Sequence, residues 1–240
     1  VASQSWGEWQ FEIDSPLVKG SSVLKADNSP VVMTLDYVHM PPAEQSPPAL
    51  TAGATSADVL VQFRKVLDND SLKDMAPADL LPMDVEIGEF FMGGWNLGSW
   101  KLTTRPQADG LHVNIAEGLM KGMTITGDMY WTLGDWGHRT RIEGLQIRGK
   151  DLAEVQKAFR QDVIVEGKSF KAGINLDWMG SPLAFNSYSL DGQASVRIDN
   201  GTWKTEGGGA LKAFGMLNFN SISRRLQLDF SDLYQSGVAF

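Results

Sequence analysis

The sequence Arg225-Leu-Gln-Leu-Asp-Phe-Ser-Asp-Leu233 alternates apolar and polar residues and then shifts phase, because Leu233 follows Phe230 by three positions. Strict alternation predicts a strand with one buried face. A one-residue shift would turn the later apolar residues outward unless the strand carries a bulge. The same pattern recurs at Val31, Met33, Leu35, Val38 and Met40, at Met83, Val85, Ile87, Phe90 and Met92, and at Ile142, Leu145 and Ile147. The recurrence predicts long strands that bend over one continuous apolar surface.

Most of the remaining chain has the same character. Alternating segments recur about every ten to twelve residues from Met83 onward, which is typical of an antiparallel meander. Asp199-Asn-Gly201 predicts a hairpin turn into a strand at Thr202–Thr205. Further strands are predicted at 6–14, 17–26, 100–105, 111–115, 120–131, 139–148, 169–178 and 191–198. The fold class is therefore mostly β, with bulged antiparallel strands in a curled, groove-like sheet that forms an open trough or a flattened sandwich.

Helices are few and short in this pattern. Residues Ala57–Leu67 predict a helix capped by Ser56, inside a flexible loop or insertion at 41–80. A second helix is predicted from Asp151 to near Arg160, and a third within Ala210–Phe219. We expect residues 1–240 to form a single β-rich segment. The chain starts at Val1 rather than at Met, so we expect it to be a fragment of a longer protein.

Charge and composition exclude several classes of function. The net charge of −8 and pI of about 4.9 disfavour binding to nucleic acid and simple docking on anionic lipid headgroups. The absence of cysteine excludes disulfides and Cys-based zinc sites. No apolar run is long enough to span a membrane, and no signal peptide is visible.

The sequence contains no recognisable catalytic or metal-binding motif. Its three histidines, His39, His112 and His138, are not spaced as metal-ligand pairs. The carboxylates alternate with apolar residues and single out no catalytic pair, as expected of a solvated face. Neither glycine cluster matches a phosphate-binding loop, and no serine nucleophile motif is present. We therefore expect a protein that is not an enzyme and that needs no metal or other cofactor.

Several segments carry a family resemblance. They are Trp9-Gln-Phe-Glu-Ile-Asp-Ser-Pro-Leu-Val-Lys-Gly20, Leu81-Pro-Met-Asp-Val-Glu-Ile87, Gly93-Gly-Trp-Asn-Leu-Gly98, Asp199-Asn-Gly-Thr-Trp203, Gly208-Gly-Ala-Leu-Lys-Ala-Phe-Gly-Met-Leu217 and Arg224-Arg-Leu-Gln-Leu-Asp-Phe-Ser-Asp-Leu233. This ordered set resembles the C-terminal region of YhdP-type proteins of the AsmA-like superfamily, which also includes TamB. The resemblance covers the chain except for 41–80, which looks like a divergent insertion.

The resemblance implies a location and a partner. Such proteins are expected to be periplasmic, anchored in the inner membrane of a Gram-negative envelope, and to pass phospholipid between the two membranes along a β-sheet groove. No nucleic-acid partner is implied, and open sheet edges leave edge-to-edge self-association possible.

A set of apolar residues is the candidate lining of this groove. Its members are Val31, Met33, Leu35, Met83, Val85, Ile87, Met123, Ile125, Ile174, Leu176, Leu226, Leu228 and Phe230. The alternative for the same residues is an ordinary closed core. Two other functions stay open at this point. One is an envelope carbohydrate-binding domain that uses some of the eight tryptophans, and the other is a structural or interaction segment that docks through Ala210–Phe219.

Overall fold

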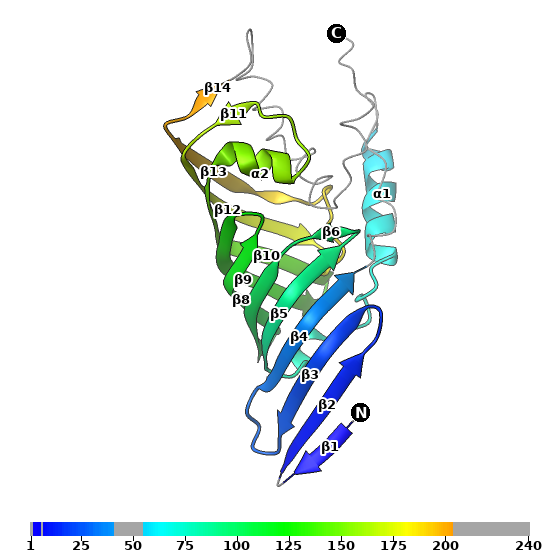
Figure 1. Cartoon of the computed structure of the whole chain (residues 1–240). Helices are drawn as coiled ribbons and strands as arrows, with labels where there is room; N and C mark the ends of the chain where they lie inside the picture. The colour runs from blue at the N-terminus through cyan, green and yellow to red at the C-terminus, as the bar shows by residue number, and fades with distance from the viewer. Residues whose placement is uncertain (1, 6, 41–54, 204–240) are drawn as a thin grey trace.

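A computed structural model describes residues 2–5, 7–40 and 55–203 (Figure 1). They form one large, open, curled sheet with two α-helices. In spatial order, the strands of the sheet are β1 (Ala2–Ser5), β2 (Glu8–Asp14), β3 (Val18–Lys25), β4 (Val31–Met40), β5 (Met83–Met92), β7 (Ser99–Gln107), β8 (Gly110–Met120), β9 (Met123–Gly134), β10 (Gly137–Lys150), β12 (Ser169–Met179) and β13 (Asp191–Asp199), while β6 (Trp95–Asn96) pairs with β5. The predicted mostly-β class and curled sheet are confirmed.

Strands β4 and β5 form a parallel pair, with Val31 opposite Met83 and Met40 opposite Met92. The other neighbouring strands of the described sheet are antiparallel, so the purely antiparallel expectation is wrong at this one place. A parallel neighbour requires the chain to return to the end at which the first strand began. Residues 41–82 make that return, so the segment interpreted as an insertion carries the crossover.

Helix α1 (Ser56–Asp68) and the short 3₁₀ helix η1 (Pro77–Asp79) lie within this return. The predicted helix is confirmed, but its cap is Thr55 rather than Ser56. The Thr55 side chain accepts a hydrogen bond from the Asp58 N–H, and the Asp58 carboxylate accepts one from the Thr55 N–H. The side chains of Thr55 and Asp58 therefore each accept a hydrogen bond from the backbone N–H of the other residue, which is the capping box arrangement.

Within the described sheet, three strands carry bulges that shift the pairing register. The extra residue is Asp36 in β4, Ala116 in β8 opposite β7, and Gly144 in β10 opposite β9. The first and third lie where the sequence pattern shifts phase, between Leu35 and Val38 and between Ile142 and Leu145. The bulges re-aim the later side chains, so apolar residues stay on one face of the sheet along its whole length.

The C-terminal part of the described chain contains α2 (Leu152–Ala158) and a small second sheet of β11 (Val165–Glu166) and β14 (Thr202–Trp203). The helix predicted from Asp151 is confirmed. The hairpin predicted at Asp199-Asn-Gly201 is wrong, because β14 pairs with β11 instead of folding back on β13. Figure 1 shows α2 and this small sheet together beyond one end of β12.

Some predictions lie outside the described residues. These are the strand at Arg225–Leu233, the helix within Ala210–Phe219 and the lining residues Leu226, Leu228 and Phe230. Within the described chain, no helix is both long enough and apolar enough to cross a membrane.

Candidate functional site

The strand register brings the predicted lining residues of β4 and β5 directly together. Val31 lies opposite Met83, Met33 opposite Val85, and Leu35 opposite Ile87. Because side chains alternate between the two faces of a strand, all six lie on the same face. Two residues far apart in the sequence therefore meet at each of three successive levels of the sheet.

Two rows of directly paired residues extend this apolar face across eight strands. The first row consists of Val31, Met83, Thr104, Val113, Met129, Ile142, Leu176 and Gly192. The second row consists of Leu35, Ile87, Trp100, Gly118, Ile125, Ile147, Ala172 and Val196. Neither row contains a charged side chain. By strand alternation Met123 and Ile174 lie on this face as well, so the ten described lining residues share one continuous surface.

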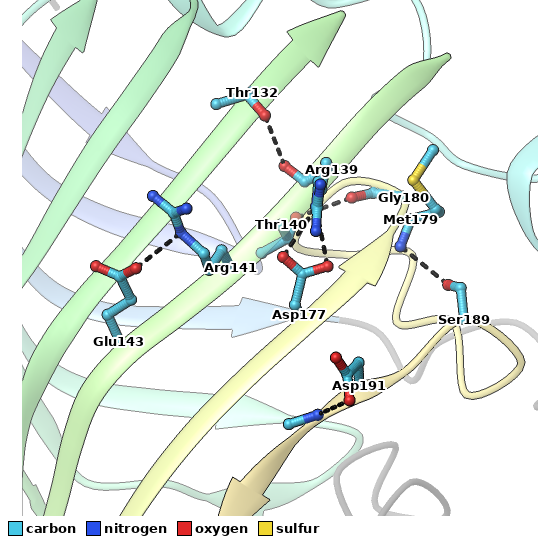
Figure 2. Close-up of polar contacts among 11 residues, drawn as sticks. Thr132, Arg139, Thr140, Arg141, Glu143, Asp177, Met179, Gly180, Ser189 and Asp191 are labelled. Carbon is cyan, nitrogen blue, oxygen red and sulfur yellow. Dashed lines mark hydrogen bonds and ion pairs between the residues drawn. The ribbon is translucent and has the colours of Figure 1, made fainter.

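The opposite face is polar and is held by ion pairs between neighbouring strands. Figure 2 shows Arg139 of β10 bound by both carboxylate oxygens of Asp177 in β12, at 2.9 and 2.8 Å. The figure also shows Arg141 paired with Glu143 of the same strand at 3.0 Å. Further pairs on this face are Lys25–Glu8, Lys101–Glu86 and Arg105–Asp84. The sheet therefore separates one charged, solvated face from one apolar face.

Exposure of the apolar face varies from its edges to its floor. Trp9 and Phe11 of β2 are 42% and 37% exposed, and Val196 of β13 is 49% exposed. Residues in the middle strands are buried, among them Val85 and Ile125. A curled sheet of this kind fits a groove. Its two edges, which we call the lips, are apolar and exposed to water, whereas its middle strands, which we call the floor, are buried.

One end of the groove is filled by the segment that follows α1. Leu72 and Leu80 pack against a buried cluster formed by Leu111, Val113 and Trp131. The buried carboxylate of Asp70 anchors this segment. It accepts hydrogen bonds from the N–H and the hydroxyl of Ser181, at 2.9 and 2.7 Å, and from the Leu72 N–H at 2.9 Å.

A buried histidine supports the same end. The indole N–H of Trp131 donates to Nδ1 of His138 at 3.0 Å, and Nε2 of His138 lies 2.9 Å from the Lys73 carbonyl oxygen. Because Nδ1 accepts, the proton of a neutral ring must be on Nε2, where it donates to that carbonyl. His138 therefore has a structural role in which both ring nitrogens are satisfied.

Helix α2 covers the groove at its other end. Val155 of α2 is buried against Met123 and Phe170, with Ile147, Phe159 and Ile198 packed around them. The predicted lining residue Met123 thus lies beneath the helix. Between the two covered ends, Ile87 and Ile174 stay half-buried on the apolar face.

The polar face contains the ionisable cluster with the clearest perturbation. Asn114 and His112 hydrogen-bond one oxygen of Asp128, at 2.9 and 2.8 Å. The hydrogen bond from Asn114 is the main cause that lowers the pKa of Asp128 below its ordinary value; burial opposes it, and the contact with His112 lowers the pKa further. The imidazole also stacks on Tyr130, with ring centroids 4.7 Å apart. This cluster joins the neighbouring strands β8 and β9 on the polar face of the sheet.

A hollow of about 430 Å³ lies at the bend of β4 and β5. Its walls include Leu35, Ile87 and Trp100 of the second row as well as the charged residues Asp36, Glu86, Lys101 and Glu117. Lys101 is already paired with Glu86 at 3.2 Å. Among the described residues, no group of three or more His, Asp or Glu side chains is arranged to hold a metal ion.

Comparison with known proteins gives one match. The family model described as YhdP protein matches residues 1–240, the whole sequence. The chain belongs to the YhdP family. No curated protein and no solved structure matches it. YhdP proteins are in general a lipid-transport-related family and are not known as enzymes.

In this YhdP-family chain, sequence reasoning overlooked part of the apolar face. Trp100, Gly118 and Ala172 stand in the second row but were not among the predicted lining residues. The tryptophans also divide between roles: Trp131 and Trp178 are buried, whereas Trp136 is 88% exposed in the turn between β9 and β10. The pairing register, rather than residue type, identifies which residues belong to the groove.

Proposed function

We propose that this chain is a non-enzymatic lipid-binding and lipid-transfer segment, whose apolar face carries the acyl chains of phospholipid. The observation that supports this most strongly is the pair of uncharged rows that crosses eight strands, together with the exposed apolar residues at the two lips. A soluble domain that exposes such a surface normally uses it for interaction. The family, which is lipid-transport-related in general, points in the same direction.

The mechanism follows from the physics of apolar burial. Each methylene group removed from water contributes about 0.8 kcal/mol, and this contribution has no preferred direction. An acyl chain on a smooth apolar floor is therefore held by many equivalent contacts and can slide without a large barrier. The headgroup stays in water near the lips, so no charged atom needs to be buried.

The cellular setting is a further part of the proposal. As a YhdP-family member, the chain would act in the periplasm of a Gram-negative envelope, as part of a bridge-like protein anchored in the inner membrane. It would then carry phospholipid between the inner and outer membranes. Both membranes would be its partners through the full-length protein. Among the described residues, β1 and β13 are the edge strands of the sheet, where edge-to-edge association would occur.

Native mass spectrometry of the purified chain, combined with solvent extraction, tests the central claim. We expect phospholipid to co-purify, or to be taken up when vesicles of phosphatidylethanolamine and phosphatidylglycerol are offered, in roughly stoichiometric amounts. A chain that stays free of lipid after this exposure would contradict the groove. The family membership would then support the fold alone.

A further inference from the structure

Four side chains gather at the α2 end of the groove, and we call them the cationic mouth: Trp95, Lys121, Phe159 and Arg160. The rings of Trp95 and Phe159 stack with centroids 6.5 Å apart. The amino group of Lys121 lies 5.6 Å from the centroid of each ring, and the guanidinium of Arg160 lies 5.0 Å from that of Trp95. Two cations are thus held on one aromatic pair.

The cationic mouth is continuous with the apolar face. Phe159 packs against the buried cluster of Met123, Val155 and Phe170 beneath α2. Trp95 of β6 lies opposite Met92, the last residue of β5. A molecule that lay along the groove floor would therefore reach these two cations directly at its end.

Neither cation is neutralised within the described chain. The ion pairs of the described residues include neither Lys121 nor Arg160. On α2, the carboxylate of Glu154 is bound by Lys157 at 2.7 Å. The aromatic rings stabilise the cations through their negative faces but leave the N–H donors available for an anion.

The backbone conformation at Lys121 and Arg160 is a second, independent observation. Five described residues other than glycine have a positive φ angle, and three of them are Asn28, Asp151 and Asn200, the residue types that tolerate this conformation. The other two are Lys121, at 47°, and Arg160, at 55°. Lysine and arginine are less favourable at such positions than asparagine or glycine. Local backbone conformation therefore does not explain why these two positions carry cations.

From this geometry we infer that the cationic mouth binds the phosphate of a lipid headgroup, an inference that rests on the proposed function of the groove. A phosphate accepts charge-assisted hydrogen bonds from the planar fork of arginine and from the ammonium of lysine. The acyl chains of the same molecule would lie on the adjoining apolar floor. The chain's overall negative charge does not oppose this, because the attraction between the phosphate and the two cations is local and distant charges are screened by salt.

The test compares two lipids that differ by one phosphate, dioleoylphosphatidic acid and dioleoylglycerol, with inorganic phosphate as a third probe. The variant K121Q/R160Q removes both charges of the cationic mouth. The control R148Q/K171Q removes one arginine and one lysine that are directly paired neighbours on β10 and β12, exposed on the polar face. Uptake by the delipidated full chain is measured by native mass spectrometry.

We expect K121Q/R160Q to lower the affinity for phosphatidic acid about tenfold, because charge-assisted hydrogen bonds are lost. Uptake of dioleoylglycerol should be unchanged, which also shows that the groove is folded. The R148Q/K171Q control should bind both lipids as the parent does. An equal loss in both variants, or no loss in K121Q/R160Q, would overturn the headgroup site while leaving the groove intact.

The remaining outcomes separate this site from the proposed function. Loss of dioleoylglycerol together with phosphatidic acid in K121Q/R160Q would mean that the two cations only hold α2 in place, which overturns the inference. Binding of inorganic phosphate without uptake of either lipid would identify a free-phosphate site and also overturn it. If the parent chain takes up no probe at all, the lipid groove fails and the headgroup site fails with it.

Discussion

Gly127 of β9 and Leu145 of β10 approach each other so closely that no side chain fits between their backbones. A Cβ atom on Gly127 would lie 2.7 Å from the Cα of Leu145 and 3.1 Å from its nitrogen. This contact sits at the bulge of β10, where Gly144 has a φ of 58°. The bend that keeps apolar residues on one face therefore depends on the absence of a side chain at Gly127.

Replacing Gly127 with alanine should destabilise the fold by about 1–3 kcal/mol, because backbone atoms rather than a flexible side chain must move. Chemical denaturation measures the loss. The matched control is Gly134→Ala on the same strand, where an added Cβ meets nothing within 4 Å. Equal stability of the two variants would mean that the bulge can relax freely.

Replacing Asp70 should destabilise the fold more than replacing the nearby residue Asp74. Asp70→Ala leaves the N–H and hydroxyl of Ser181 and the N–H of Leu72 without their buried acceptor. We expect a loss of about 2–3 kcal/mol in the free energy of unfolding, since several buried hydrogen bonds to a charged group are broken. Asp74→Ala, at an exposed position, should stay within about 0.5 kcal/mol of the parent. If Asp70→Ala behaves like Asp74→Ala, the segment after α1 does not anchor this end of the groove.

The sequence predicts the bends well only where apolar residues mark them. Leu35 to Val38 and Ile142 to Leu145 reveal two bulges because each apolar run resumes on the shifted phase. The bulge in β8 falls on Ala116, next to Glu117, and no large apolar residue there marks the change. Local alternation therefore reveals a bulge only when apolar residues flank it on both sides.

Contacts between distant segments could not be predicted in the same way. Alternation is identical in parallel and antiparallel strands, so the parallel pairing of β4 with β5 leaves no local signal. Asp70 and Ser181 are 111 residues apart and each resembles an ordinary loop residue. Lys121 and Arg160 likewise resemble solvated turn residues until folding brings both to Trp95.

The stability of the fold should depend on Asp128 at acid pH. Hydrogen bonds lower the pKa of this carboxyl in the folded chain below its ordinary value of 3.8. Its contribution is therefore complete above the unfolded pKa and is lost as the pH falls through the lower folded pKa. Asp128→Asn should reduce the difference in stability between pH 5 and pH 3 by about 0.5 kcal/mol or less, because the side chain is 37% exposed and partly screened. Asp135→Asn, in an exposed turn, is the control, and an equal change in both variants would contradict a specific role for Asp128.

Two adjacent residues of β4, Met33 and Val32, lie on opposite faces of the sheet and allow the effect of a charge on each face to be compared. Met33 is half-buried on the apolar face, whereas Val32 points to the polar face and is 44% exposed. A glutamate at either position adds the same charge to the same strand. Only Met33→Glu places that charge where acyl chains would lie, and an unpaired charge next to hydrocarbon is strongly unfavourable.

We therefore expect Met33→Glu to lose phospholipid uptake by at least about tenfold while Val32→Glu keeps it, as measured by native mass spectrometry after exposure to phospholipid vesicles. Both variants should unfold cooperatively, because Met33 is not among the fully buried residues. Val85→Glu provides the opposite reference: Val85 is 8% exposed, so a charge there should destabilise the fold itself. If Met33→Glu unfolds the chain as Val85→Glu does, this part of the face is a closed core. If it folds and still takes up lipid, the acyl chains do not lie against β4.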